Sequence, residues 1–153
     1  SEAFYAKVEK LSGTIRGTLG RVSEVLEQLG DMETVIVRAR IAKTDLLAEV
    51  QQLKKAIVVQ RELMQSDEIR DGFSEPVVPS IMSRLYGASA GRNSTHGPTK
   101  THRRQYEIAL ERFAEVYPKF QKLIEGDLKK LHQKLDQAGV PWTTGRPTPD
   151  LKK

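Results

Sequence analysis

The stretch that decides the fold is QYEIALERFAEVYPKFQKLIEGDLKKLHQKL, residues 105–135. Apolar side chains recur in it every three or four residues, which is the spacing that places them on one face of an α-helix. They are Tyr106, Ala109 or Leu110, Phe113, Tyr117, Phe120, Ile124, Leu128, Leu131 and Leu135. We therefore predict a long amphipathic helix that begins after Pro98 and ends at Gly139, because Pro141 prevents continuation.

Pro118 lies in the middle of this pattern. A proline removes one backbone donor and costs about 3 kcal/mol in a regular helix. The apolar phase nevertheless continues from Phe113 to Ile124, so we predict a kink at Pro118 and not a helix boundary.

Two more helical patterns precede this one. The first runs from Ala3 to Leu29 with nearly heptad spacing, through Val8, Leu11, Ile15, Leu19, Val22 and Leu26. Gly30 is predicted to close that helix and Asp31 to cap the next one. The second helix is predicted over residues 32–66, with Val35, Ala39, Ala42, Leu46, Val50, Leu53, Ile57, Gln60 and Met64 on one face.

A short helix is predicted over PSIMSRLYG, residues 79–87, with Pro79 in its first turn and Gly87 at its end. The predicted fold class is therefore all-α: an antiparallel bundle of three long helices and one short helix, with the last helix kinked. We expect one domain over residues 1–147 and a polar C-terminal tail over residues 148–153.

Composition excludes several classes of site. The 153 residues include no cysteine, which rules out disulfides, thiolate metal sites and cysteine nucleophiles. The net charge is +5, and residues 98–153 carry all of the excess, with twelve basic and seven acidic residues. These charges alternate in sign as on a solvated helix face, whereas a nucleic-acid binder carries a denser basic stripe. No apolar run approaches the roughly 20 residues of a membrane span.

Metal-binding and catalytic patterns are missing from the sequence. His96, His102 and His132 lack the spacing of metal ligands, so we interpret them as solvated surface side chains. Glu107, Glu111 and Glu115 recur at steps of four, but no Glu-x-x-His accompanies them. We therefore predict no catalytic, cofactor-binding or metal-binding residue.

Basic residues within reach of these glutamates favour a salt-bridged outer face; they are Arg103, Arg104 and Arg112. Lys100, Arg103 and Arg104 also form a basic cluster at the start of the long helix, where the helix terminus adds positive potential. They are candidate residues for an acidic ligand such as nucleic acid or an acidic glycan. Against nucleic acid, Tyr106 and Phe113 fit the core stripe and not an exposed stacking row.

The only tryptophan, Trp142, lies in AGVPWTTGRP, residues 138–147. If Gly139 reverses the chain, the ring can fold back over the end of the bundle and cover Leu135. Burial of such a ring contributes about 2–3 kcal/mol. We predict this plug; the alternative is an exposed platform that stacks on a sugar.

Three segments resemble a known family. They are IMSRLYG (81–87), STHGPTKTHRRQYEIALERFAEVYPKF (94–120) and DLKKLHQKLDQAGVPWTTGRP (127–147). In this order they resemble the C-terminal helical region of bacterial sortilin-like BNR-repeat β-propeller proteins, which are often labelled glycosyl hydrolase-like. The resemblance covers residues 79–147, about half of the chain.

The resemblance implies a helical appendage of a larger periplasmic or secreted protein. Any glycosidase activity would then belong to a propeller, whose S-x-D-x-G-x-T-W repeats do not occur here. We therefore expect a non-enzymatic accessory domain without a cofactor. Its expected partner is a protein, either its own propeller or a second chain; an autonomous module for an acidic ligand is the alternative.

Overall fold

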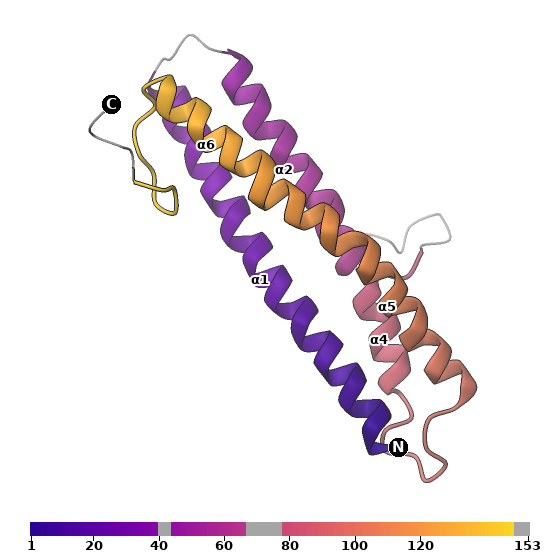
Figure 1. The fold of residues 1–153 in the computed structure, drawn as a ribbon. Helices are drawn as coiled ribbons and strands as arrows, with labels where there is room; N and C mark the ends of the chain where they lie inside the picture. The colour runs from indigo at the N-terminus through magenta and orange to yellow at the C-terminus, as the bar shows by residue number, and fades with distance from the viewer. Residues whose placement is uncertain (40–43, 67–77, 149–153) are drawn as a thin grey trace. The chain divides into compact units, whose positions relative to one another are not determined.

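The structure is a computed structural model that describes residues 1–39, 44–66 and 78–148. These residues form α-helices and one π-helical segment, and no β-strand occurs among them. The elements are α1 (Glu2–Arg38), α2 (Thr44–Met64), α4 (Ile81–Ser89), α5 (Lys100–Gln121), η1 (Lys122–Asp127) and α6 (Leu128–Gln137) (Figure 1). The prediction of an all-α helical bundle is confirmed.

The chain divides into two compact units, and α1 contributes to both. The first unit consists of residues 1–20 and 59–118. In it the ring of Phe4 on α1 meets that of Tyr106 on α5, with centroids 5.9 Å apart. Arg84 of α4 donates to Gln105 of α5 at 3.1 Å. The first unit is therefore a small bundle of its own, and the single domain over residues 1–147 stays a prediction.

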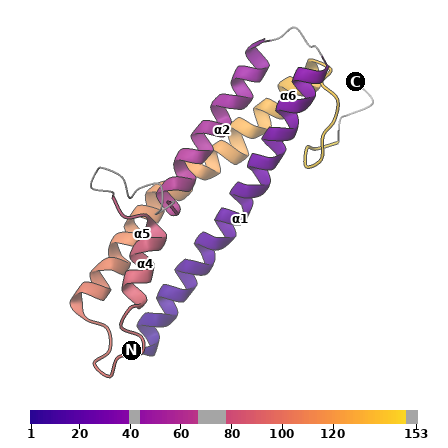
Figure 2. The same ribbon diagram turned by 180° about the vertical axis from the view of Figure 1, so that it is seen from behind.

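The second unit consists of residues 21–58 and 119–153. Figures 1 and 2 both show α2 and α6 beside the C-terminal part of α1. Lys54 of α2 donates to Glu33 of α1 at 3.2 Å. Lys134 of α6 donates to Glu49 of α2 at 2.9 Å. Helices α1 and α2, which follow one another in the chain, run antiparallel in this unit, as predicted (Figures 1 and 2).

Helix α1 buries side chains at alternating steps of four and three residues. The seam positions are Phe4, Val8, Leu11, Ile15, Thr18, Val22, Val25, Leu29, Met32 and Ile36; Tyr5 and Ser12, each next to a seam residue, are buried as well. A period of about 3.5 residues is that of a left-handed coiled coil. The predicted stripe has nearly this phase, but Thr18 and Val25 occupy the seam in place of Leu19 and Leu26, which are only half-buried.

The predicted boundary at Gly30 is wrong. Helix α1 continues through Gly30 and Asp31 to Arg38, so Gly30 is not a stop and Asp31 is not a cap. Met32 and Ile36 extend the buried seam beyond the glycine. Burial of two such side chains contributes more than the roughly 1 kcal/mol that a helical glycine costs.

Helix α2 follows the predicted phase over the residues that the structure describes. Leu46, Val50, Leu53, Ile57 and Met64 are buried, and Gln60 is half-buried in the same seam. Of the predicted positions that precede this helix, Val35 and Ala39 lie outside the buried seam, and Ala42 lies outside the described residues.

Helix α4 is displaced by two residues from its prediction. It begins at Ile81, and the Oγ of Ser80 accepts from the amide of Ser83 at 3.2 Å as its N-cap. Pro79 therefore precedes the cap. Gly87 lies inside the helix beside Gln105 of α5, and a Cβ there would be in ordinary van der Waals contact, 3.7 Å from Gln105 Cγ.

Helix α5 passes through Pro118 without a boundary, as predicted. The irregular turn follows in η1, where the amide of Leu128 bonds the carbonyl of Leu123, five residues earlier. A π-helical turn adds one residue to a helix. In α5 the buried positions are 109, 113, 116 and 120, and an unbroken heptad would continue with 127, 130 and 134. The observed positions are 128, 131 and 135, one residue later, which the extra residue explains.

Replacement of seam residues tests the phase of this long helix. Phe113 and Leu131 are buried, so Phe113→Ala or Leu131→Ala should cost about 2–5 kcal/mol in the free energy of unfolding. Lys129 is exposed, and Lys129→Ala should cost less than about 0.5 kcal/mol. Denaturant melts measure all three, and the reverse order would contradict the phase.

Two glycines should respond in opposite directions to alanine. A Cβ at Gly17 would meet no atom within 4 Å, so Gly17→Ala should stabilise the chain by up to about 1 kcal/mol. Gly139 has a φ of +73°, so Gly139→Ala should destabilise it. Thermal melts of both variants give the comparison; a destabilised Gly17→Ala would show that backbone freedom is not the controlling factor.

Candidate functional site

After α6 the chain folds back in a segment that we call the clasp, residues 139–148. Its first turn is a helix-ending motif in which the amide of Gly139 donates to Asp136 O at 3.1 Å. The amide of Val140 donates to Leu135 O at 3.0 Å. Gly139 supplies the left-handed residue that this motif requires, which confirms it as the predicted stop.

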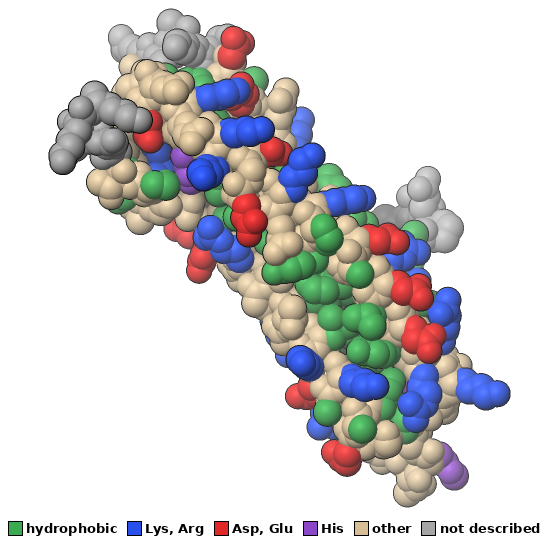
Figure 3. All heavy atoms as spheres, in the orientation of Figure 1, with side chains coloured by type: hydrophobic (Ala, Val, Ile, Leu, Met, Phe, Trp, Pro, Cys, Tyr) green, Lys and Arg blue, Asp and Glu red, His purple; other side chains and the backbone are tan. Residues whose placement is uncertain are grey.

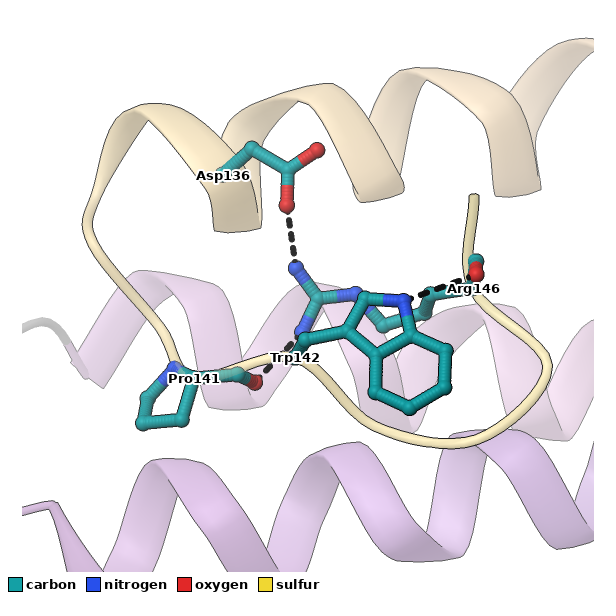
Figure 4. Close-up of polar contacts among 4 residues, drawn as sticks. All are labelled: Asp136, Pro141, Trp142 and Arg146. Carbon is teal, nitrogen blue, oxygen red and sulfur yellow. Dashed lines mark hydrogen bonds and ion pairs between the residues drawn. The ribbon is translucent and has the colours of Figure 1, made fainter. Parts of the chain in front are cut away.

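Arg146 holds the clasp closed. Its guanidinium is fully buried and donates from Nη1 to the carbonyl of Pro141 at 2.8 Å (Figure 4). Its Nη2 donates to the carboxylate of Asp136 on α6 at 2.5 Å. Charge-assisted hydrogen bonds are the strong ones, so this side chain ties both ends of the clasp to the helix.

Trp142 is fixed in place but is not buried. Its Nε1 donates to the carbonyl of Arg146 at 2.9 Å, and 49% of the residue is exposed (Figure 4). The predicted plug is therefore wrong: Val140, two residues earlier, is the buried side chain. The indole N–H bonds to the backbone of the clasp itself, at Arg146, so the ring does not have to enter the core to satisfy its donor.

The clasp also packs on α1. Gly145 has a φ of +90°, and a Cβ there would overlap the side chain of Gln28. Thr143, a residue of the clasp itself, is buried. Its Oγ1 and the Nε of Arg146 have no hydrogen-bond partner among the described residues. The underside of the clasp is therefore polar as well as enclosed.

His132 lies on α6, four residues before Asp136, and it is buried. Its Nε2 has no hydrogen-bond partner in the described part of the chain. Burial lowers the pKa of this imidazole, and the charges of Arg146 and Arg21 lower it further, while the carboxylate of Asp136 opposes the shift. The interpretation of His132 as a solvated surface side chain is wrong.

The other two histidines lie in the first unit. His96 is exposed, as predicted. His102 caps α5: its Nδ1 accepts from the amide of Thr99 at 3.1 Å, and Thr99 Oγ1 accepts from the amide of His102 at 3.2 Å. This reciprocal pair is a capping box in which histidine replaces the usual Glu or Gln.

The basic cluster at the start of α5 is exposed, but two of its three side chains are engaged. Arg103 lies over the ring of Phe4, with its guanidinium carbon 5.1 Å from the centroid. Arg104 pairs with Glu107 at 3.1 Å and with Glu111 at 4.0 Å. Basic and acidic side chains are interspersed on the face drawn in Figure 3. The predicted salt-bridged outer face is confirmed for Arg104.

A shallow groove of about 290 Å³ lies in the second unit between α2 and the η1–α6 segment. Leu53 and Leu131 line it, and Lys134 and Glu49, which form an ion pair, lie at its rim. No group of three His, Asp or Glu that could hold a metal ion occurs within residues 1–39, 44–66 and 78–148. The clasp, by contrast with this open groove, contains the buried polar side chains Thr143 and Arg146.

Comparison with protein-family models, with curated proteins and with solved structures found no match. No helix in the described ranges is long and apolar enough to cross a membrane. The clasp must therefore be interpreted from its own geometry.

The sequence indicated Trp142 but not the residues that hold it. Arg146 stands in a Pro- and Thr-rich end, where an arginine is ordinarily solvated. The available signal was the pair Gly139 and Gly145, because glycine accepts the left-handed conformation that turns a chain back. A return of the chain over α6 would have placed Arg146 near Asp136.

Removal of the guanidinium tests the clasp. Arg146→Ala leaves Asp136 and the Pro141 carbonyl without their donor, and it should cost about 1–3 kcal/mol in the free energy of unfolding. Arg92→Ala is the control, since its pair with Glu9 is exposed and should cost less than about 1 kcal/mol. Equal melts for the two variants would contradict the role of Arg146.

Proposed function

We propose that this chain is a non-enzymatic helical interaction module and that Trp142 on the clasp contacts its partner. The supporting observation is the half-exposed indole, held by its bond to the Arg146 carbonyl. Tryptophan is enriched among the residues that dominate the energy of protein interfaces. A ring that is already ordered loses little further freedom on binding, which favours affinity.

The parent protein is part of the same proposal. The resemblance of residues 79–147 to the helical region of sortilin-like BNR-repeat proteins supports a module of a larger extracytoplasmic protein. The partner would then be the propeller of that protein or a second chain. The engaged state of Arg103 and Arg104 argues against the alternative acidic ligand, whose binding would weaken steeply with added salt.

Binding should depend on Trp142. If the gene encodes S-x-D-x-G-x-T-W repeats before residue 1, the separately produced propeller should bind this chain. Trp142→Ala should then weaken binding by at least about 2 kcal/mol, or roughly 30-fold. Tyr86→Ala is the matched control, because Tyr86 is also exposed, at 57%, but lies in the first unit. Isothermal titration calorimetry measures both.

If the partner is a second copy of this chain, analytical sedimentation of the chain alone should show self-association, and Trp142→Ala should remove it. Equal binding by both variants would contradict the assignment to Trp142. Glycoside hydrolysis by the purified chain, abolished by one substitution, would contradict the non-enzymatic assignment.

A further inference from the structure

A buried histidine lies one helical turn from the carboxylate that holds the clasp. His132 and Asp136 are four residues apart on α6, so their side chains lie on the same face of the helix. Because Arg146 binds Asp136, its guanidinium lies over this face as well. His132 is only 8% exposed, and its Nε2 has no hydrogen-bond partner among the described residues.

Charged groups from three segments act on His132. Arg146 belongs to the clasp, Asp136 to α6 and Arg21 to α1. The carboxylate of Asp136 already accepts from Arg146, and Arg21 pairs with Glu24 at 3.3 Å. A positive charge on the ring would therefore be repelled by Arg146 and Arg21. Its only nearby carboxylate, Asp136, already accepts the hydrogen bond that holds the clasp.

We propose that His132 is an acid-sensitive switch: protonation of its buried ring opens the clasp, residues 139–148, and withdraws Trp142 from its fixed position. A charge on the ring is unfavourable in place, because its Nε2 has no hydrogen-bond partner among the described residues and Arg146 carries the same charge. Opening lets the ring reach water. The effect on partner binding rests on the proposed function, whereas the opening itself does not.

The direction of the pH dependence follows from linkage. Burial and Arg146 hold the pKa of His132 below its ordinary 6.5 while the clasp is closed. An opened clasp would return the pKa towards that value, so acid favours the open state. Stability of the clasp is complete above pH 6.5 and falls as the pH drops towards the lowered pKa. At a pH below both values, each unit by which the pKa of His132 is higher in the open clasp than in the closed one favours opening about ten-fold.

The single tryptophan reports the opening. Acrylamide quenching of Trp142 should rise as the pH falls from about 7.5 to about 5, while far-UV circular dichroism shows retained helices. His132→Gln should abolish the rise. His102→Gln and His96→Gln should keep it, since glutamine preserves the capping box of α5 and His96 is exposed.

A second measurement does not depend on a variant that replaces His132. The NMR titration of the three imidazoles in the unmodified chain should show one with a lowered pKa, and Arg146→Gln should move it back towards 6.5. Quenching that rises equally in His132→Gln, or an imidazole that titrates while quenching stays constant, would overturn the switch.

The two proposals can fail separately. Loss of partner binding in Trp142→Ala at neutral pH tests only the interaction surface. Quenching against pH needs no partner and tests only the opening of the clasp.

Discussion

Burial of the α1 seam is the constraint on which both compact units depend. Helix α1 supplies residues 1–20 to one unit and 21–38 to the other, and its buried positions keep a period of about 3.5 residues through both. Four glycines lie within this helix, each of which weakens a helix by about 1 kcal/mol. Each buried Leu, Ile or Val contributes about 1.5–3 kcal/mol, so the seam sustains the helix where local propensity would end it.

The α5–η1–α6 segment also keeps a continuous buried seam, but it does so through a change in its hydrogen bonding. Pro118 removes a backbone donor, and the buried positions from Leu128 onwards stand one residue later than the heptad that ends at Phe120. The π-helical turn at residues 122–127 takes up that residue, which returns Leu128, Leu131 and Leu135 to the buried face. The irregular hydrogen bonding is therefore what preserves regular packing.

The clasp depends on charge as well as on the burial of Val140. A single guanidinium satisfies Asp136 and the Pro141 carbonyl, and the returning backbone accepts from the indole of Trp142. Burial of this cation is tolerable because both of its terminal nitrogens find acceptors. Burial and the nearby charge of Arg146 also favour the neutral form of His132. The contacts of Arg146 therefore do two things: they hold Trp142 in place at the surface, and they make the buried guanidinium tolerable.

The sequence by itself determined the all-α class and most of the buried positions, because apolar spacing of three or four residues is a local property that only a helix can bury. It also determined the stop at Gly139, where a left-handed residue and Pro141 act on neighbouring backbone. It did not determine that α1 passes Gly30, since that outcome depends on what Met32 and Ile36 pack against. Nor did it determine the exposure of Trp142 or the burial of His132 and Arg146. These depend on the return of residues 139–148 over α6 and α1, and contacts between segments far apart in the chain leave no periodic pattern in the sequence.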